Sequence, residues 1–319
     1  MSQFSKATFD AAAYLACRPT YGSARTSPFY QLAYAYHANR GGQWGQALDI
    51  GCGPGFIAQQ LADRFERVTA IDPSAKMVAV GLQPEAADRP PIRYEVGSAE
   101  DLAMLATGSV DLITAGQAAH WFTYPAAWAE LGRVLRPRGT AAFFGYGEYH
   151  LPAYPSVSPL ITAFMRSSEG LGPYWQQPGR AIVEALLDPI PFPSPPAEVR
   201  TSDSWTDFPL AEPNLPQPDS MSASDGNGEW DPASFIRLKT VSRSGDKLAI
   251  RKTLDWLALA AYLRTSSALH KYEEAHPEET DVVGAYVRKL REAVEREAGH
   301  EVATVDVEWP AVVVLAGKT

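Results

Sequence analysis

A run of glycines, followed one predicted strand later by an acidic residue, is the pattern in this 319-residue chain that best specifies chemistry. The run Gly51-Cys52-Gly53-Pro54-Gly55 follows a short apolar segment and precedes a helical pattern. Glycine at such a turn lets the backbone bend tightly and approach a ligand with no Cβ in the way. The next apolar segment ends in Asp72, at the position where a carboxylate accepts hydrogen bonds from ribose hydroxyls. An ordinary tight turn is the simpler explanation of the glycines alone, and Asp72 favours a nucleotide-type ligand.

Two residues beside the turn discriminate between nucleotide cofactors. The dinucleotide fingerprint has Gly or Ala at its sixth position, where this chain has Phe56. Asp49, just before the turn, places a carboxylate where a pyrophosphate would be repelled and a cationic group attracted. The pattern therefore disfavours a nicotinamide-dependent oxidoreductase and favours S-adenosyl-L-methionine, which carries an ammonium and a sulfonium.

The elements that must position these residues alternate between strand and helix. Apolar, β-branched segments predict strands at 47–50, 68–71, 92–96, 110–114 and 139–144, and helical spacing predicts helices at 56–65, 74–80 and 128–135. This alternation indicates an α/β fold with a doubly wound, mostly parallel sheet. Since the carboxyl ends of parallel strands meet at one edge, we expect the glycine turn and Asp72 to lie together there.

The second half of the chain is less regular. Residues 201–231 hold seven acids, four prolines and no Lys or Arg, which predicts a long solvated loop. Strands are expected at 235–241, joined by a turn to 247–253, and at 305–315, with amphipathic helices at 254–272 and 281–298. We divide the chain into N-terminal lid helices at 1–40, a cofactor-binding core at 41–150, and substrate-cap helices at 151–319 whose closing strands complete the same sheet.

The segment 116–122 follows the fourth predicted strand, at the sheet edge where α/β folds place substrate chemistry. Within it, His120 is the side chain best placed to act as a general base, and Trp121 could wall a pocket. A hydrogen-bonded structural histidine and a core tryptophan are the simpler explanations of the pair.

The glycine turn resembles motif I of the class I S-adenosylmethionine-dependent methyltransferases. The resemblance implies a Rossmann-like, seven-stranded sheet and S-adenosyl-L-methionine as cofactor, with the glycines along its amino-acid part and Asp72 on its ribose. It also implies that the turn 97–101 faces the adenine; a helix N-cap at Ser98 is the alternative. The cofactor-binding residues expected are Tyr14, Arg18, Asp49, Gly51, Cys52, Gly53, Gly55, Asp72, Pro73, Met77, Ser98, Ala99, Glu100, Gln117 and Ala118.

Four blocks of the chain resemble a narrower group, the fungal trans-aconitate 3-methyltransferases and related cantharidin methyltransferases. They are 9–21, the glycine turn together with 119–122, Leu-Gly-Pro-Tyr-Trp-Gln-Gln-Pro-Gly-Arg at 171–180, and Leu-Arg-Thr-Ser-Ser-Ala-Leu-His at 263–270. Ser266 and Leu269 stand where the group usually has aromatic residues, which predicts a wider cavity and puts trans-aconitate itself in doubt. The substrate-binding residues expected are Trp121, Tyr146, Tyr174, Trp175, Arg180 and Arg264.

The chemistry that the resemblance implies is methylation of a carboxylate on a trans-aconitate-like acid or related metabolite. A carboxylate is ionised at pH 7 and needs no base, so alignment carries the catalysis and no metal is required. Arginine binds carboxylates bidentately, which makes Arg18, Arg180 and Arg264 the candidate receptors. Two alternatives stay open: a hydroxyl or thiol acceptor on a fungal secondary metabolite, with His120 as catalytic base, and a non-catalytic cofactor-binding relative.

Composition bounds the partners and the compartment. Lys and Arg number 28 against 37 Asp and Glu, and the net charge of −9 disfavours nucleic acid and anionic membranes. Two cysteines fit a reducing compartment, and no signal peptide or membrane span is recognisable. We expect a cytoplasmic enzyme that acts on a small molecule and is a monomer or a weak homodimer.

Overall fold

The computed structural model describes residues 17–84, 86, 88–193, 200–202, 230–239 and 248–319. Tyr14 and most of the acidic segment 201–231 lie outside this part of the chain. No helix in the described ranges is long and apolar enough to cross a bilayer.

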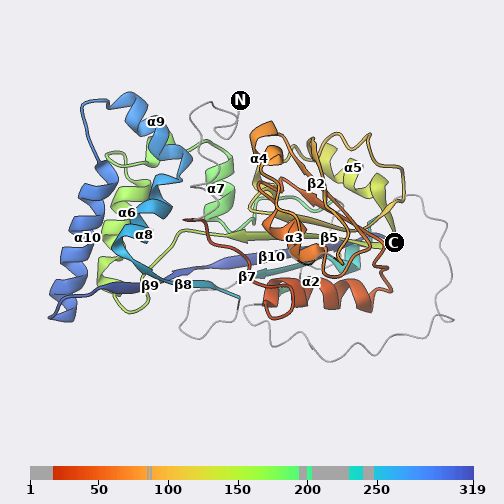
Figure 1. The fold of residues 1–319 in the computed structure, drawn as a ribbon, viewed down its shortest axis with the longest axis horizontal. Coiled ribbons are helices and arrows are strands. Elements are labelled where there is room, and N and C mark those ends of the chain that lie inside the picture. The colour runs from red at the N-terminus through yellow and green to blue at the C-terminus, as the bar shows by residue number, and fades with distance from the viewer. Residues whose placement is uncertain (1–16, 85, 87, 194–199, 203–229, 240–247) are drawn as a thin grey trace.

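An eight-stranded sheet runs through the molecule, in the order β3-β2-β1-β4-β5-β10-β7-β6 (Figure 1). Strands β1 to β5 pair in parallel, and β10 is antiparallel to both of its neighbours. The expected doubly wound, mostly parallel sheet of seven strands is confirmed, with β6 as a three-residue addition at the edge. The strands are β1 (Gln46–Ile50), β2 (Arg67–Asp72), β3 (Arg93–Val96), β4 (Val110–Gly116), β5 (Leu135–Tyr146), β6 (Arg200–Ser202), β7 (Ile236–Lys239) and β10 (Ala311–Gly317).

Helices cover both faces of the sheet. Successive residues of a strand point to opposite faces, so Ala47 belongs to one apolar cluster and Leu48 to the other. Helices α2 (Pro28–Asn39) and α3 (Phe56–Leu61) pack in the first cluster, and α5 (Ala126–Val134) packs in the second. The short helix α4 (Ala75–Ala79) lies against β2 and β3. Because α2 packs on β5 and β10, it is part of the core and not of a lid, contrary to our division of 1–40.

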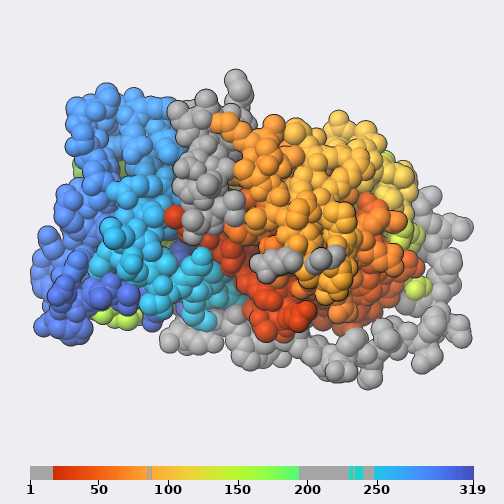
Figure 2. All heavy atoms as spheres, viewed as in Figure 1, coloured from red at the N-terminus to blue at the C-terminus, as the bar shows by residue number. Residues whose placement is uncertain are grey.

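The remaining elements lie mostly beside the main sheet, on the left in Figure 1, and we call them the cap. In the space-filling view of Figure 2 this side of the molecule consists largely of C-terminal residues, coloured blue. Its antiparallel strands β8 and β9 form a sheet of their own. Helix α7 lies between the cap and the core (Figure 1). The elements are α6 (Ser158–Arg166), α7 (Gly179–Glu184), β8 (Ile250–Asp255), α8 (Trp256–Arg264), α9 (Ser267–Ala275), α10 (Val282–Ala298) and β9 (Thr304–Trp309).

Three expectations about the closing elements are wrong. The single strand at 305–315 is two strands in different sheets, divided at Pro310, which has no N–H to donate to a ladder. The strands predicted as neighbours, β7 and β8, lie in different sheets, so only β7 and β10 complete the main one. The helix at 254–272 is divided into α8 and α9, because the backbone of Ser266 is extended.

Candidate active site

Three adjoining cavities lie at the carboxyl ends of β1, β2, β4 and β5. The large cavity, of about 300 Å³, lies between Asp72 and Trp121; the loop cavity, of about 70 Å³, lies under the glycine turn beside Asp49. The cap cavity, of about 100 Å³, lies between His120 and the cap residues Tyr262 and Ser266. Gln117 lines all three, so they adjoin at this residue, and together we call them the chamber.

The glycine turn shapes the first two cavities. Gly51 and Gly53 have positive φ angles of 63° and 52°, a conformation that glycine adopts at no steric cost. A Cβ on Gly51 would lie 2.4 Å from the Cβ of Ala118. A Cβ on Gly53 would meet no atom of the described residues within 4 Å, so it would stand in the cavity. The turn therefore forms an open concave surface, here called the cradle, because neither glycine carries a side chain that would obstruct it.

Asp72 joins the end of β2 to this turn. Its Oδ2 accepts a hydrogen bond from the Gly53 N–H at 2.9 Å, and its Oδ1 accepts one from the Ser74 N–H at 2.8 Å. Burial raises the pKa of the carboxyl, and these two N–H groups oppose the rise. Each carboxylate oxygen accepts more than one bond, so Asp72 can also accept from hydroxyls in the large cavity.

The adenine turn expected at 97–101 also faces the large cavity, through Ser98, Ala99 and Glu100. The Thr123 N–H donates to Glu100 Oε1 at 2.6 Å and holds that side chain. The alternative of a helix N-cap at Ser98 is wrong, because residues 97–105 contain no helix.

Asp49 is buried in the floor of the loop cavity. Its Oδ1 accepts from the Thr114 hydroxyl at 2.8 Å, and its Oδ2 has no hydrogen-bond partner among the described residues. Burial raises the pKa of this carboxyl to about 7. A buried acceptor without a donor is costly, and a cationic ligand group in the loop cavity would relieve that cost. The open cradle and this carboxylate together fit a cofactor with an ammonium group.

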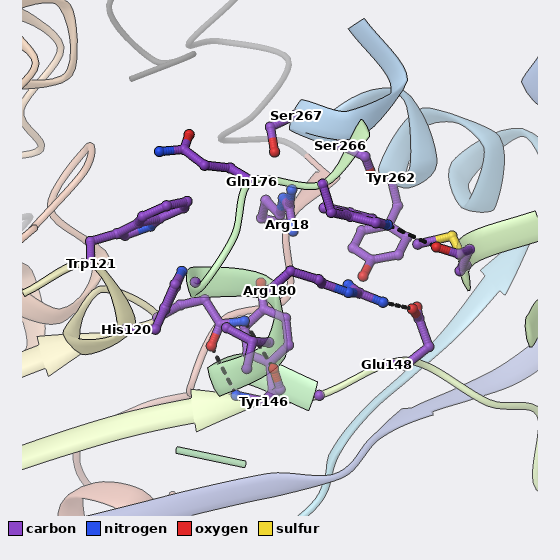
Figure 3. A pocket seen from close by; sticks show the side chains of 16 residues that line it. Arg18, His120, Trp121, Tyr146, Glu148, Gln176, Arg180, Tyr262, Ser266 and Ser267 are labelled. Atoms are coloured by element: carbon purple, nitrogen blue, oxygen red, sulfur yellow. Dashed lines mark hydrogen bonds and ion pairs between the residues drawn. The ribbon is translucent and has the colours of Figure 1, made fainter. Parts of the chain in front are cut away.

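His120 lies in the short 3-10 helix Ala119–Trp121 and lines the cap cavity (Figure 3). Burial lowers the pKa of its imidazole to about 3, so the ring is neutral, and its Nδ1 has no partner within the described chain. Helix α7 presses against this ring and its neighbour: a Cβ on Gly179 would lie 2.9 Å from the Trp121 ring and 3.2 Å from His120.

Arg180 also lines the cap cavity, but its charge is already paired. Its Nη2 donates to Glu148, its Nε donates to Glu184 Oε1 at 2.6 Å, and its guanidinium lies 4.1 Å from the Trp175 ring centroid. Figure 3 shows the Arg180 side chain reaching across the cavity toward Glu148.

Arg18 stands where the cap and loop cavities meet. Its Nη2 donates to the Thr265 carbonyl at 3.0 Å, and its guanidinium lies 5.5 Å from the Tyr262 ring centroid. Arg18 thus joins the core side of the chamber to helix α8 of the cap.

Most of the expected site residues line the chamber, and three described ones do not. Arg264 pairs with Asp281 at 2.7 Å on the surface, and the Tyr174 hydroxyl is bonded to His276 Nε2 at 2.7 Å. Gly55 lies behind the turn, where a Cβ would meet the Tyr94 hydroxyl at 1.9 Å. Those that line it are Arg18, Asp49, Gly51, Cys52, Gly53, Asp72, Pro73, Met77, Ser98, Ala99, Glu100, Gln117, Ala118, His120, Trp121, Tyr146, Trp175 and Arg180.

Several lining residues were not expected. Glu148 follows the end of β5 by two residues, so the rule that ligands bind at the carboxyl ends of parallel strands could have identified it. Gln176 and Ser267 face both the large and the cap cavity, and both belong to blocks of the family resemblance. No local pattern distinguishes Tyr262 from the core residues of α8.

Comparison with known proteins agrees with this geometry. Residues 48–143 match the family described as methyltransferase domain. The chain is 31% identical over 198 residues to methyltransferase cfoB of Aspergillus candidus, covering 57% of this chain and 59% of the relative. It is 39% identical over 99 residues to malonyl-[acyl-carrier protein] O-methyltransferase of Pectobacterium atrosepticum, covering 31% of this chain and 37% of the relative. The chain thus spans little more than half of cfoB.

A solved structure shares almost the whole architecture. A putative type II methyltransferase from Anaeromyxobacter dehalogenans superposes with a TM-score of 0.60 at 26% identity, covering 93% of this chain and 97% of the other. Core and cap therefore occur together in that protein.

Proposed function

We propose that this chain, which carries a class I methyltransferase domain whose cofactor is S-adenosylmethionine, methylates a carboxylate of a small molecule. The observation that carries the acceptor class is the state of His120, a neutral imidazole with a pKa of about 3 beside the cofactor cavities. Such a ring is a weak base, and a carboxylate acceptor needs none.

The large and loop cavities would hold the cofactor. Asp72 would accept hydrogen bonds from the ribose hydroxyls, and Asp49 would pair with the ammonium under the glycine turn. Bound in this way, the cofactor supplies an electrophilic methyl group on its sulfonium. Tyr146, whose main chain is held by Gln117 between the loop and cap cavities, would align the acceptor with that group.

The acceptor would occupy the cap cavity. The first acid to test is trans-aconitate or a related metabolite, as the family resemblance implies. The likeness to a protein named as an O-methyltransferase supports oxygen as the atom methylated. Tyr262, which faces the cap cavity, is not predisposed to act as a base, since burial raises its pKa above the usual range.

A second candidate is methylation of a hydroxyl or thiol on a fungal secondary metabolite. The observation that favours it is the unpartnered Nδ1 of His120, which could accept the proton that such an acceptor must lose. A non-catalytic role is the remote third, and the open chamber disfavours it.

The test is transfer of radioactive methyl from the cofactor to a panel of carboxylic acids, phenols and thiols. With an acid acceptor, His120→Gln should leave the rate above pH 6 nearly unchanged, as should the surface control His270→Gln. A loss of about 100-fold in His120→Gln alone would instead establish base catalysis and favour the second candidate. Methylation of no acid in the panel would contradict the proposal.

A further inference from the structure

We propose that Glu148 lowers the affinity of the cap cavity for acceptors with a second carboxylate, because Glu148 and Glu184 already neutralise the guanidinium of Arg180. The inference rests on the proposed carboxylate acceptor and narrows its class, so that trans-aconitate, which has three carboxylates, becomes a disfavoured acceptor. It replaces our expectation that Arg180 receives a substrate carboxylate.

The hydrogen bonds of Arg180 show how the guanidinium is blocked. A carboxylate binds one edge of a guanidinium through two parallel N–H bonds. Along the Nε and Nη2 edge of Arg180, each nitrogen donates to a different protein carboxylate, Glu184 and Glu148 respectively. An incoming acid can bind that edge only by displacing one of them.

Burial makes displacement unfavourable. The side chains of Arg180 and Glu148 are only 10% and 11% exposed, so their attraction is weakly screened. Separating the pair would leave Glu148 partly buried without its cation, which is strongly destabilising. Trp175 stacks on the guanidinium and is itself held by a 2.8 Å bond from its Nε1–H to the Met165 carbonyl, so Arg180 has little freedom to turn.

The charges of the ion pairs around Arg180 also sum to zero. Arg166 lies 3.4 Å from Glu184, so the connected group consists of two arginines and two glutamates. This group adds no net positive charge for a second carboxylate, and Glu148 is the member that faces the cavity beside Arg180.

One part of the remaining wall is aromatic. The rings of Trp121, Tyr146, Trp175 and Tyr262 face the cap cavity together with Met165. Aromatic walls favour hydrocarbon or aromatic ligands. An acceptor that fits this cavity would place an aromatic or hydrocarbon group against these rings and polar groups toward Gln176, Ser266 and Ser267, which line the same cavity.

The test is calorimetric binding of two acids with one skeleton, 4-phenylbutyrate and benzylsuccinate, to the full chain saturated with S-adenosylhomocysteine. The wild type should bind the monoacid more tightly. Glu148→Gln keeps the shape and removes the charge, and it should strengthen diacid binding about 10-fold or more and monoacid binding by a smaller factor, so that the ratio of the two affinities shifts toward the diacid. Glu148→Asp, whose shorter side chain withdraws from Arg180, should shift the ratio in the same direction.

The control is the double variant Glu148→Gln with Arg180→Met, which should lose the gain because the receptor is gone. A wild type that prefers the diacid, or a ratio unchanged in both Glu148 variants, would overturn the role of Glu148. Failure of every acid to bind any of the proteins, with S-adenosylhomocysteine still bound, would contradict the carboxylate acceptor itself.

Discussion

The side-chain amide of Gln117 and the main chain of Tyr146 exchange two hydrogen bonds, Nε2–H to the Tyr146 carbonyl and the Tyr146 N–H to Oε1, each 2.9 Å long. Gln117 has a positive φ of 51°, and its own N–H donates to the Phe144 carbonyl at 2.8 Å. These bonds join the ends of β4 and β5 at the residue that lines all three cavities. Because its amide is already paired, Gln117 serves to position the chamber walls.

Gln117→Leu removes this pair at similar volume and leaves the Tyr146 N–H and carbonyl without their partner. We expect the free energy of unfolding to fall by about 1–3 kcal/mol, the usual cost of an unsatisfied buried polar group. Urea denaturation measures it, with Gln31→Leu, remote from the chamber, as the control. Equal stability of the two variants would mean that the pair contributes nothing.

Asp72→Ala should weaken S-adenosylhomocysteine binding roughly 10- to 150-fold, since each hydrogen bond to a charged acceptor contributes about 1.5–3 kcal/mol. Titration calorimetry measures the affinity. Asp63→Ala removes a surface carboxylate that pairs with Arg89 and should leave the affinity unchanged. Undiminished binding in Asp72→Ala would contradict the placement of the ribose.

The buried carboxyl of Asp49 predicts a pH-dependent stability. Its pKa is about 7 in the folded chain against 3.8 as the reference, so the native state holds the proton more tightly. This contribution is complete below about pH 4 and is lost as pH rises through 7. Relative to Asp49→Asn, the unliganded wild type should lose stability between pH 4 and 7, as chemical denaturation at several pH values would show. A constant difference would mean that the carboxyl is already ionised.

The same carboxyl should couple cofactor binding to proton release. An ammonium in the loop cavity favours ionised Asp49, so S-adenosylhomocysteine should bind about 10-fold more tightly at pH 7.5 than at pH 5.5. Asp49→Asn should flatten this dependence. Methylthioadenosine, which lacks the amino-acid part, is the matched ligand and should bind the wild type with no such dependence. A pH dependence shared by both ligands would place the ammonium elsewhere.

Arg264→Met should change the kcat/KM for the best acid less than twofold. Its side chain is 49% exposed and pairs with Asp281 outside the chamber, and exposed ion pairs contribute little. Steady-state kinetics measures it. A large rise in KM would show that this arginine reaches the acceptor after all.

The lining of the large and loop cavities could be predicted from the sequence because its signals are local. The glycine turn and Asp72 each occupy the end of a predicted strand, and the topology of a parallel sheet brings such ends together. The cap could not be predicted in the same way, because it depends on the rotation of a helix. Tyr262 and Arg264 are two positions apart on α8, about 200° around its axis, so one faces the cavity and the other the solvent.

The neutralisation of Arg180 depends on a residue far from it in the sequence. Glu148 lies 32 positions earlier in the chain, and no spacing rule connects the two. The sequence identifies an arginine in the right block, but whether that arginine offers its charge to a ligand depends on a partner that only the packing of α7 supplies.

The place of β10 between β5 and β7 has a consequence for biosynthesis. The ribosome makes β10 after every other strand of the sheet. Until β10 has been made, β5 and β7 lack the strand that pairs with both of them. Until then the long strand β5 presents an unpaired edge, which invites pairing with other nascent chains. Every described residue that lines the chamber lies at or before Ser267, yet a ribosome-bound chain that has emerged only that far cannot assemble the sheet. The sheet that carries these residues is therefore complete only after the seven residues of β10, none of which lines any of the three cavities, have been made.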